Sequence, residues 1–263
     1  MADSLDMSGR GVLVTGGTRG IGRSIAERFL AVGASVVACG RTEPDRPIES
    51  EGRQAVFVPA DVRDPESVDA MFDAALARID RLDLLVNNAG GAPPAETGTA
   101  SPRFSRAIIE LNLIAPLVCS QRANACMQRQ EHGGAIVNIA SVSAIRPSPG
   151  AAAYGAAKAG LLNLTATMAV EFAPKVRVNA VVAGLIETEQ SSLYYGDEAG
   201  VAAVAETVPL GRMGTGEDVA NVCLFLASPL ASYVSGASIV VHGGGERPAF
   251  LDAATPATPA SPA

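Results

Sequence analysis

A tyrosine and a lysine stand four residues apart in the segment AAAYGAAKAG, as Tyr154 and Lys158. On a helix this spacing puts both side chains on one face, where a phenol and an ammonium can meet the same ligand. A free tyrosine titrates at about 10, and a fixed cation beside it favours the phenolate. The pair therefore predicts proton-transfer chemistry at neutral pH. The alternative is an ordinary pair of neighbours on a helix.

The choice of lysine at this position is informative. Lysine and arginine together number 20 in the chain, and only Lys158 and Lys175 are lysines. An ammonium is compact and has three rotatable donors, whereas a guanidinium is planar and forked. We therefore expect position 158 to require the ammonium itself.

A glycine-rich segment near the N-terminus, GVLVTGGTRGIGRSIAERFL, contains Gly16, Gly20 and Gly22. These glycines lie between a predicted strand and a predicted helix. Without side chains there, backbone N–H groups and the helix N-terminus can approach a pyrophosphate. Three glycines alone are more often a turn, but in this context they predict a dinucleotide site.

The elements that must position these residues follow from the alternation of short β-branched segments with longer Ala-rich or amphipathic ones. That pattern is typical of a parallel sheet covered by helices on both faces. Strands are predicted at residues 11–15, 35–39, 55–58, 83–86, 135–139, 176–182 and 238–241, and helices at 20–32, 65–79, 103–130, 152–173 and 217–227. No change in composition marks a domain boundary, so we predict one α/β domain with a doubly wound, seven-stranded parallel sheet.

Composition narrows the class of partner. The 263 residues are 48% hydrophobic, enough for the core of one large domain. A net charge of −7 argues against binding to nucleic acid or to an anionic membrane, so we expect small-molecule partners or other proteins. Four cysteines without a CxxC spacing and two histidines predict no metal site. The chain starts without an apolar run typical of a signal peptide, and we expect a cytoplasmic protein.

Taken together, these motifs resemble the short-chain dehydrogenase/reductase family over residues 8–245. The resemblance is carried by TGGTRGIG (15–22), Asp61-Val62, NNAG (87–90), Asn112, Ser141 and YGAAK (154–158). It implies a Rossmann fold and an NAD(P)-dependent enzyme that interconverts ketones and secondary alcohols. The chain departs from the family at Ala183-Gly184, where Pro-Gly is usual. The missing proline is expected to loosen a loop and puts no catalytic residue in doubt.

The resemblance also assigns residue roles. It implies a catalytic tetrad of Asn112, Ser141, Tyr154 and Lys158, in which Lys158 also binds the nicotinamide ribose and Asn112 holds a water in a proton relay. Ser141 would hydrogen-bond the substrate oxygen, with Ser143 as a competitor, and the alternative for Asn112 is a buried amide bonded to backbone. The implied cofactor-binding residues are Gly16, Thr18, Arg19, Gly20, Ile21, Gly22, Arg41, Asp61, Val62, Asn88, Ala89, Gly90, Tyr154, Lys158, Gly184 and Thr188.

The cofactor preference depends on charge after the second strand. An acidic residue there would favour NAD(H), whereas arginine accommodates the 2′-phosphate of NADP(H). The strand ends in VVACGRT, with Gly40 at the position of the acid, Arg41 after it and Arg19 in the glycine segment. We predict NADP(H). In the alternative both arginines are surface charges, and Glu43 binds the ribose of NAD(H).

Residues 1–245 are predicted to form the catalytic domain, with 185–208 as a substrate lid and 246–263 as a disordered, Pro- and Ala-rich tail. Leu185, Leu193, Tyr194 and Tyr195 of the lid predict an apolar, alicyclic, steroid-like or acyl-CoA substrate. The alternative is a 3-oxoacyl-[acyl-carrier-protein] reductase, which the acids of the lid disfavour. Enoyl reductases, with a tyrosine six residues before the lysine, are disfavoured by Ala152.

An alternative hypothesis of a different functional class is a non-catalytic regulator that binds a nucleotide. The complete tetrad argues against this alternative. We also expect a homotetramer. The family pairs the helix that carries Tyr154, and Gly155 and Gly160 would leave its surface smooth for another helix.

Overall fold

Seven short, mostly buried strands build the central sheet of the computed structural model, which describes residues 5–253. They are β1 (Gly11–Thr15), β2 (Ser35–Gly40), β5 (Val56–Pro59), β6 (Leu84–Asn87), β7 (Gly134–Ser141), β8 (Val176–Ala183) and β9 (Ser238–Val241). All pair in parallel, in the order β5-β2-β1-β6-β7-β8-β9, so the predicted sheet is confirmed. The order reverses between β1 and β6, where folds of this kind bind ligands.

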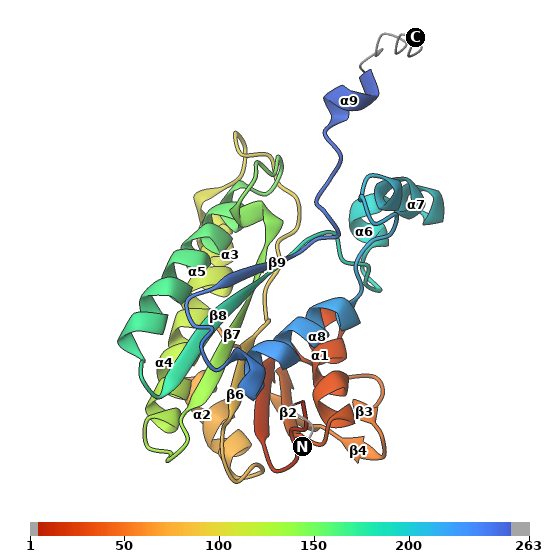
Figure 1. Ribbon diagram of the computed structural model, residues 1–263. Coiled ribbons are helices and arrows are strands. Elements are labelled where there is room, and N and C mark those ends of the chain that lie inside the picture. The colour runs from red at the N-terminus through yellow and green to blue at the C-terminus, as the bar shows by residue number, and fades with distance from the viewer. Residues whose placement is uncertain (1–4, 254–263) are drawn as a thin grey trace, which may run out of the picture.

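Helices cover both faces of the sheet (Figure 1). On one face, α1 (Gly20–Ala31) packs against α8 (Gly216–Ala227), and on the other lie α2 (Pro65–Leu76), α4 (Ala115–Met127) and α5 (Ala152–Glu171). A capping box starts α8: the Thr215 hydroxyl accepts from the Asp218 N–H, and the Asp218 carboxylate accepts from the Thr215 N–H.

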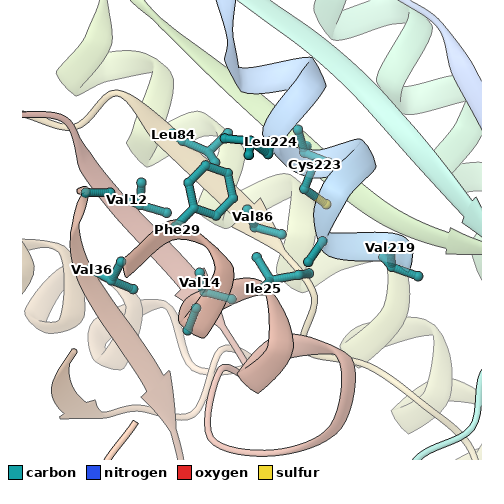
Figure 2. Close-up of a cluster of buried hydrophobic side chains, with 14 of the residues drawn as sticks. Val12, Val14, Ile25, Phe29, Val36, Leu84, Val86, Val219, Cys223 and Leu224 are labelled. Carbon is teal, nitrogen blue, oxygen red and sulfur yellow. The ribbon is translucent and has the colours of Figure 1, made fainter. Parts of the chain in front are cut away.

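The core forms two layers because successive strand residues point to opposite faces of the sheet. Val12 and Val14 of β1 face α1 and α8, where they pack with Ile25 and Phe29 (Figure 2). Leu13, between them, joins the layer under α2 and α4. Near-continuous apolar strands are thus explained by burial on both sides.

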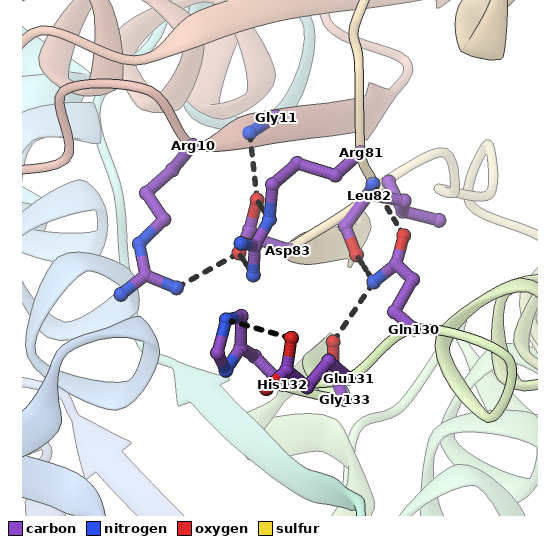
Figure 3. Close-up of polar contacts among 9 residues, drawn as sticks. All are labelled: Arg10, Gly11, Arg81, Leu82, Asp83, Gln130, Glu131, His132 and Gly133. Atoms are coloured by element: carbon purple, nitrogen blue, oxygen red, sulfur yellow. Dashed lines mark hydrogen bonds and ion pairs between the residues drawn. The ribbon is translucent and has the colours of Figure 1, made fainter.

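Polar contacts pin the amino ends of the strands (Figure 3). The buried carboxylate of Asp83, just before β6, accepts from Arg10 Nη1 at 2.9 Å, from the Gly11 N–H at 3.0 Å and from Arg81 Nε at 2.8 Å. Beside it, the Gln130 amide bonds both backbone groups of Leu82, at 2.9 Å each. These contacts hold β1, β6 and the start of β7 together at the end of the sheet where each strand begins.

The segment predicted as one helix over 103–130 is helical over residues 102–127, but it contains a π-helical segment that the sequence analysis did not predict. The structure has α3 (Pro102–Ile109), a π-helical segment η1 (Glu110–Ile114) and then α4. Pro116 is the physical reason, because it has no N–H to give to the carbonyl of Asn112 in an α-helix.

Several short elements were not predicted. A hairpin of β3 (Glu49–Ser50) and β4 (Arg53–Gln54) follows β2, and the lid segment folds into α6 (Ser192–Tyr195) and α7 (Glu198–Glu206). The sequence predicts a disordered tail, but its described part contains α9 (Ala249–Ala253); residues 254–263 lie outside the described residues. Within residues 5–253, no helix is both long and apolar enough to cross a membrane.

The glycines of α5 serve contacts within the chain. A Cβ on Gly155 would lie 2.8 Å from the carbonyl oxygen of Ser143, and one on Gly160 would lie 3.1 Å from Leu113 Cδ2. Gly160 therefore allows close approach of the neighbouring helical segment, as expected of a small residue, but this segment belongs to the same chain. Ala183 also differs from expectation, because it pairs with Ser141 on one side and Val241 on the other and so continues the sheet rather than loosening a loop.

Candidate active site

One cavity of about 970 Å³ opens where the carboxyl ends of the strands meet the lid segment. Every residue that the sequence analysis named for the cofactor lines this cavity, and so do Ser141, Tyr154 and Lys158. Asn112 lies behind its wall. The fold thus brings together cofactor-site residues that are up to 172 positions apart in the chain, from Gly16 to Thr188.

The glycine segment is held against the start of the next loop by two side chains. Thr15 Oγ1 accepts from the N–H groups of Asn88 and Ala89 at 3.0 Å each, and Asn88 Nδ2 donates to the carbonyls of Thr15 and Gly16 at 3.0 Å each. Gly16 has φ 61°, and a Cβ there would lie 2.9 Å from Ala89 Cα. Only glycine allows this backbone conformation and this close approach without strain.

The amino end of α1 is built to receive an anion. Its first turn carries no acidic residue, and its N-cap residue, Arg19, makes no side-chain cap. Instead the Gly20 N–H donates to Glu189 Oε1 at 2.9 Å, so a carboxylate from the lid segment lies at this end of the helix. Helix N-termini favour negative charge, and the glycine cradle leaves room beside them, so these residues fit the pyrophosphate of a dinucleotide.

The buried face of α5 presents Tyr154 and Lys158, with Leu161 and Thr165 further along the same face. Lys158 is 3% exposed, and its Nζ donates to the Ile139 carbonyl at 2.8 Å and lies 5.7 Å from the centre of the Tyr154 ring. Burial lowers the pKa of Lys158 to about 8. An ammonium is thus confined to the interior beside the phenol.

Ser141 ends β7 next to this pair. Burial raises the pKa of Tyr154, while its hydrogen bond with the Ser141 hydroxyl acts in the opposite direction. The sequence predicts that Lys158 lowers this pKa, but the raised value corrects that prediction for the structure, because the low-dielectric surroundings disfavour phenolate and ammonium alike. Ser143, the competitor, accepts instead from Ser148 Oγ at 3.0 Å.

Asn112 occupies the middle of the π-helical segment and is fully buried. Its Oδ1 accepts from the Gly91 N–H, and its Nδ2 donates to the carbonyls of Gly91 and Ile108, all at 2.9 Å. A Cβ on Gly90 would lie 2.7 Å from Asn112 Oδ1 and 3.3 Å from Lys158 Nζ, so this glycine lets both approach the loop. The oxygen and the nitrogen of the Asn112 side chain thus both bond to backbone groups. The main-chain carbonyl of Asn112 is left for any further partner.

Charged groups line the far end of the cavity, beyond β2 and β5. Asp61 accepts from Arg63 Nε at 2.9 Å, and mainly this hydrogen bond, with Arg41 contributing, lowers the pKa of Asp61 to about 2. Arg19 and Arg41 are exposed at the cavity edge, and neither forms a hydrogen bond or ion pair with another described residue through its guanidinium. Glu43, the alternative ribose ligand, lines the same part of the cavity.

Three charged residues of the cavity were not named from sequence, Asp45, Arg63 and Arg146, and Arg146 is the one beside the catalytic residues. It lies in the loop between β7 and α5 and forms an ion pair with Glu246, which follows β9, at 2.6 Å. Its position between Ser141 and Tyr154 was a usable signal, because a loop flanked by two site residues must pass along the site. The partner could not be found from sequence, since it lies 100 residues away.

Comparisons with known proteins agree with this arrangement. Residues 16–246 match a family model described as Enoyl-(Acyl carrier protein) reductase. The chain is 38% identical to 3beta-hydroxysteroid dehydrogenase 1 of Eggerthella lenta, over 91% of this chain and 94% of that one. It is 37% identical to the 3-oxoacyl-[acyl-carrier-protein] reductase FabG of Aquifex aeolicus, over 91% and 98%.

Among solved structures, the ligand-free aldohexose dehydrogenase of Thermoplasma acidophilum is similar to the chain. It superposes with a TM-score of 0.84 at 30% identity and covers 97% of this chain and 99% of that one.

The burial of Lys158 predicts a pH-dependent effect on stability. The unfolded chain keeps this proton up to about pH 10.5, whereas the folded protein releases it near 8, so between these values the unfolded state binds more protons. The free energy of unfolding of wild type should therefore rise relative to that of Lys158→Met as pH rises above 8. The rise should be at most about 1.4 kcal/mol per pH unit. Denaturant unfolding of both proteins between pH 7 and 9.5 measures this.

Lys175→Met is the matched control, because it removes the chain's other lysine from an exposed position. A stability difference between wild type and Lys158→Met that stays constant over this range would contradict the prediction.

Proposed function

The chain belongs to the short-chain dehydrogenase/reductase family, and we propose that its cavity interconverts a ketone and a secondary alcohol on an apolar, alicyclic, steroid-like or acyl-CoA substrate. It is an oxidoreductase of CH–OH groups that uses NAD(P). The observation that carries the proposal is the meeting of Tyr154, Lys158 and Ser141 beside the glycine segment, at the carboxyl end of β7.

A nicotinamide bound in this cavity supplies or accepts the hydride. In reduction the Tyr154 hydroxyl gives a proton to the substrate oxygen, and in oxidation it takes that proton back. Ser141 donates a hydrogen bond to the same oxygen, which its contact with the Tyr154 hydroxyl supports, since two groups this close can reach one atom. Such general acid–base catalysis is worth about 10² to 10⁴ in rate.

Lys158 and Asn112 support this proton transfer. The buried ammonium stabilises the phenolate whenever Tyr154 has given up its proton, and it has donors to spare for a ribose hydroxyl. Pro116 leaves the main-chain carbonyl of Asn112 without its α-helical donor, and we assign that carbonyl to the water of the relay. The glycine segment, with Asn88 and Thr188, would hold the phosphates and ribose.

Tyr154→Phe tests the central assignment. The change keeps the ring and removes the proton, so turnover should fall about 10²- to 10⁴-fold while the dissociation constant of the cofactor stays nearly the same. Steady-state kinetics with a panel of ketones, and calorimetry with the cofactor, measure the two effects. Tyr233→Phe is the matched control, because Tyr233 is fully exposed. Turnover of Tyr154→Phe within threefold of wild type would exclude this role.

NADP(H) is our proposal for the preferred cofactor. It is supported by Arg41 and Arg19 at the cavity edge, whose guanidiniums are free of other described partners, and by the lack of an acid at Gly40. Arg41 also acts electrostatically on Asp61, which supports a positive charge near the end of the cavity that we propose for the adenosine. Arginine binds phosphate through strong, charge-assisted hydrogen bonds.

Two substitutions separate this proposal from its NAD(H) alternative. Arg41→Ala should lower the ratio of kcat/KM for NADPH to that for NADH by about ten- to a hundredfold, since one such hydrogen bond contributes about 1.5 to 3 kcal/mol. Gly40→Asp should lower it too, although Thr18 must shift, because a Cβ on Gly40 would lie 3.1 Å from Thr18 Oγ1. Arg78→Ala is the surface control. A wild type that prefers NADH, or a ratio unmoved by Arg41→Ala, would favour Glu43 as the ribose ligand.

The substrate class follows from the walls of the cavity. Leu185, Tyr194 and Tyr195 line it, and the Tyr194 hydroxyl donates to the Ala92 carbonyl at 3.5 Å, so the lid reaches the opposite loop. The side chain of Leu193, named with them from sequence, lies outside the described residues. An apolar body of the substrate would contact these rings, as the resemblance to a hydroxysteroid dehydrogenase supports.

Reduction of a 3-oxoacyl group on a carrier protein is the second candidate, and it is favoured by the FabG relative. The acids of the lid disfavour it, because Glu187, Asp197 and Glu198 are exposed and would repel an acidic carrier. The description of the matching family model names enoyl reductases. The four-residue spacing of Tyr154 and Lys158 argues for carbonyl chemistry instead.

We further propose a homotetramer in the cytoplasm. Exposed apolar side chains on three separate elements support assembly: Val170 is 79% exposed at the end of α5, Tyr233 is 103% exposed before β9, and Val240 is 41% exposed within it. Light scattering at micromolar concentration should give four times the chain mass of 26.7 kDa. A monomer at that concentration would refute the assembly, and with it the use of these surfaces.

A further inference from the structure

Arg146 presents a positive charge to the substrate side of the cavity. It belongs to the loop that joins Ser141 to Tyr154, and it lines the cavity together with Ser143, Tyr154 and Tyr195. Its guanidinium is held in place by the chain: Nη1 donates to the Pro147 carbonyl at 3.1 Å and to Ser148 Oγ at 3.3 Å. One edge of the guanidinium is therefore used by its own loop, which fixes its plane.

The other edge is only half used. Nη2 donates to Glu246 Oε1 at 2.6 Å, while Nε is buried and has no hydrogen-bond partner. Nε and Nη2 point in parallel, which is the geometry that binds both oxygens of one carboxylate. A buried donor without a partner costs free energy. This edge is therefore shaped for a carboxylate that contacts both nitrogens, and Glu246 satisfies one of them.

Hydrogen bonds connect this edge to the catalytic centre. Ser148 Oγ donates to Ser143 Oγ at 3.0 Å, and the Ser143 N–H donates to Ser141 Oγ at 3.2 Å. Ser141 in turn bonds the Tyr154 hydroxyl. A molecule whose carbonyl oxygen lies at Ser141 and Tyr154 can thus reach Arg146 along a short polar wall of the same cavity.

Glu246 differs from the other partners of Arg146 because it comes from the segment after β9, whereas the rest belong to the same loop. Its carboxylate is about one third exposed, with 31% of the side chain accessible, so it can leave the guanidinium for water. The protein as a whole carries a net charge of −7 and repels anions. A preference for an anionic substrate would therefore have to come from a local cation such as Arg146.

We propose that Arg146 binds a carboxylate of the substrate in the place of Glu246, so that the enzyme acts on oxo acids and the corresponding hydroxy acids with an apolar body. The proposal rests on the proposed ketone–alcohol activity and names its substrate class. Arg146 sets specificity in it and takes no part in proton transfer.

The test compares each oxo acid with its methyl ester, which keeps the ketone and removes the charge. The probes are 4-oxocyclohexanecarboxylate and the linear acids 4-oxopentanoate, 5-oxohexanoate and 6-oxoheptanoate, each with its ester. Wild type should show at least about a tenfold higher kcat/KM for the acid in one or more pairs. The linear acid with the highest acid-to-ester ratio of kcat/KM would then indicate the distance between the ketone site at Tyr154 and the guanidinium of Arg146.

Variants locate the preference. Arg146→Met should abolish the acid-to-ester preference, and Arg146→Lys, which keeps the charge without the fork, should retain only part of it. Glu246→Gln removes the competing carboxylate and should raise kcat/KM for the acid about threefold or more without a matching rise for the ester. Arg78→Met, which makes the same charge change at an exposed site, should leave the ratio unchanged.

A binding measurement keeps this inference separate from the proposed function. Calorimetry of each acid and ester with enzyme and oxidised cofactor needs no turnover. If no ketone is reduced, the proposed function fails. The carboxylate site would still be supported if wild type bound the acid more tightly than the ester and Arg146→Met did not. Reduction of neutral ketones with equal kcat/KM for acid and ester would overturn the inference alone. Acetoacetyl-CoA serves as a further substrate. If Arg146→Met lowered kcat/KM for acetoacetyl-CoA and not for the oxo acids, the inference would also be overturned, and Arg146 would be assigned to a phosphate of coenzyme A.

Discussion

The confinement of an ammonium inside an apolar domain is the constraint on which the catalytic end of this structure depends. Burial lowers the pKa of Lys158 to about 8, so the folded chain bears a cost for keeping the charge. The Ile139 carbonyl accepts a hydrogen bond from the ammonium, and Gly90 leaves space for the ammonium beside Asn112. Proteins tolerate such a group where function needs it, and here it lies against the ring of Tyr154.

The two ends of the sheet divide stability and chemistry between them. At the amino ends of the strands, the Asp83 carboxylate is satisfied by two arginines and a backbone N–H. At the carboxyl ends, three cationic groups lack a hydrogen-bond partner among the described residues: the guanidiniums of Arg19 and Arg41, and the Nε of Arg146. Ligand binding requires polar groups without a partner in the protein. The contacts of Asp83 at the amino ends of the strands therefore have to hold the sheet in register.

The sequence was sufficient for the seven parallel strands and for the cofactor-binding residues that line the cavity. The strands follow from local apolar patterns, and the glycine segment follows from the need for close backbone approach to a pyrophosphate. The sequence was insufficient wherever a distant contact decides the outcome. The π-helical segment around Asn112 is the exception, because Pro116 is a local signal for it. The pKa of Tyr154 could not be predicted, since its direction is set by burial among groups from β7, α5 and the lid. The residue roles within the tetrad remain predictions.

Two of the open cationic features are covered by carboxylates of the chain itself. Glu189 bonds the Gly20 N–H at the amino end of α1, and Glu246 bonds Arg146 on the substrate side. Both lie in segments that leave the sheet at its carboxyl edge, after β8 and β9, and these segments contact each other where the Arg247 N–H donates to the Thr207 carbonyl at 2.9 Å. An anion that binds at either place therefore takes the position of a carboxylate from one of two segments that contact each other. Glu189 is exposed and 31% of the Glu246 side chain is accessible, so water can hydrate either carboxylate when a ligand anion takes its place.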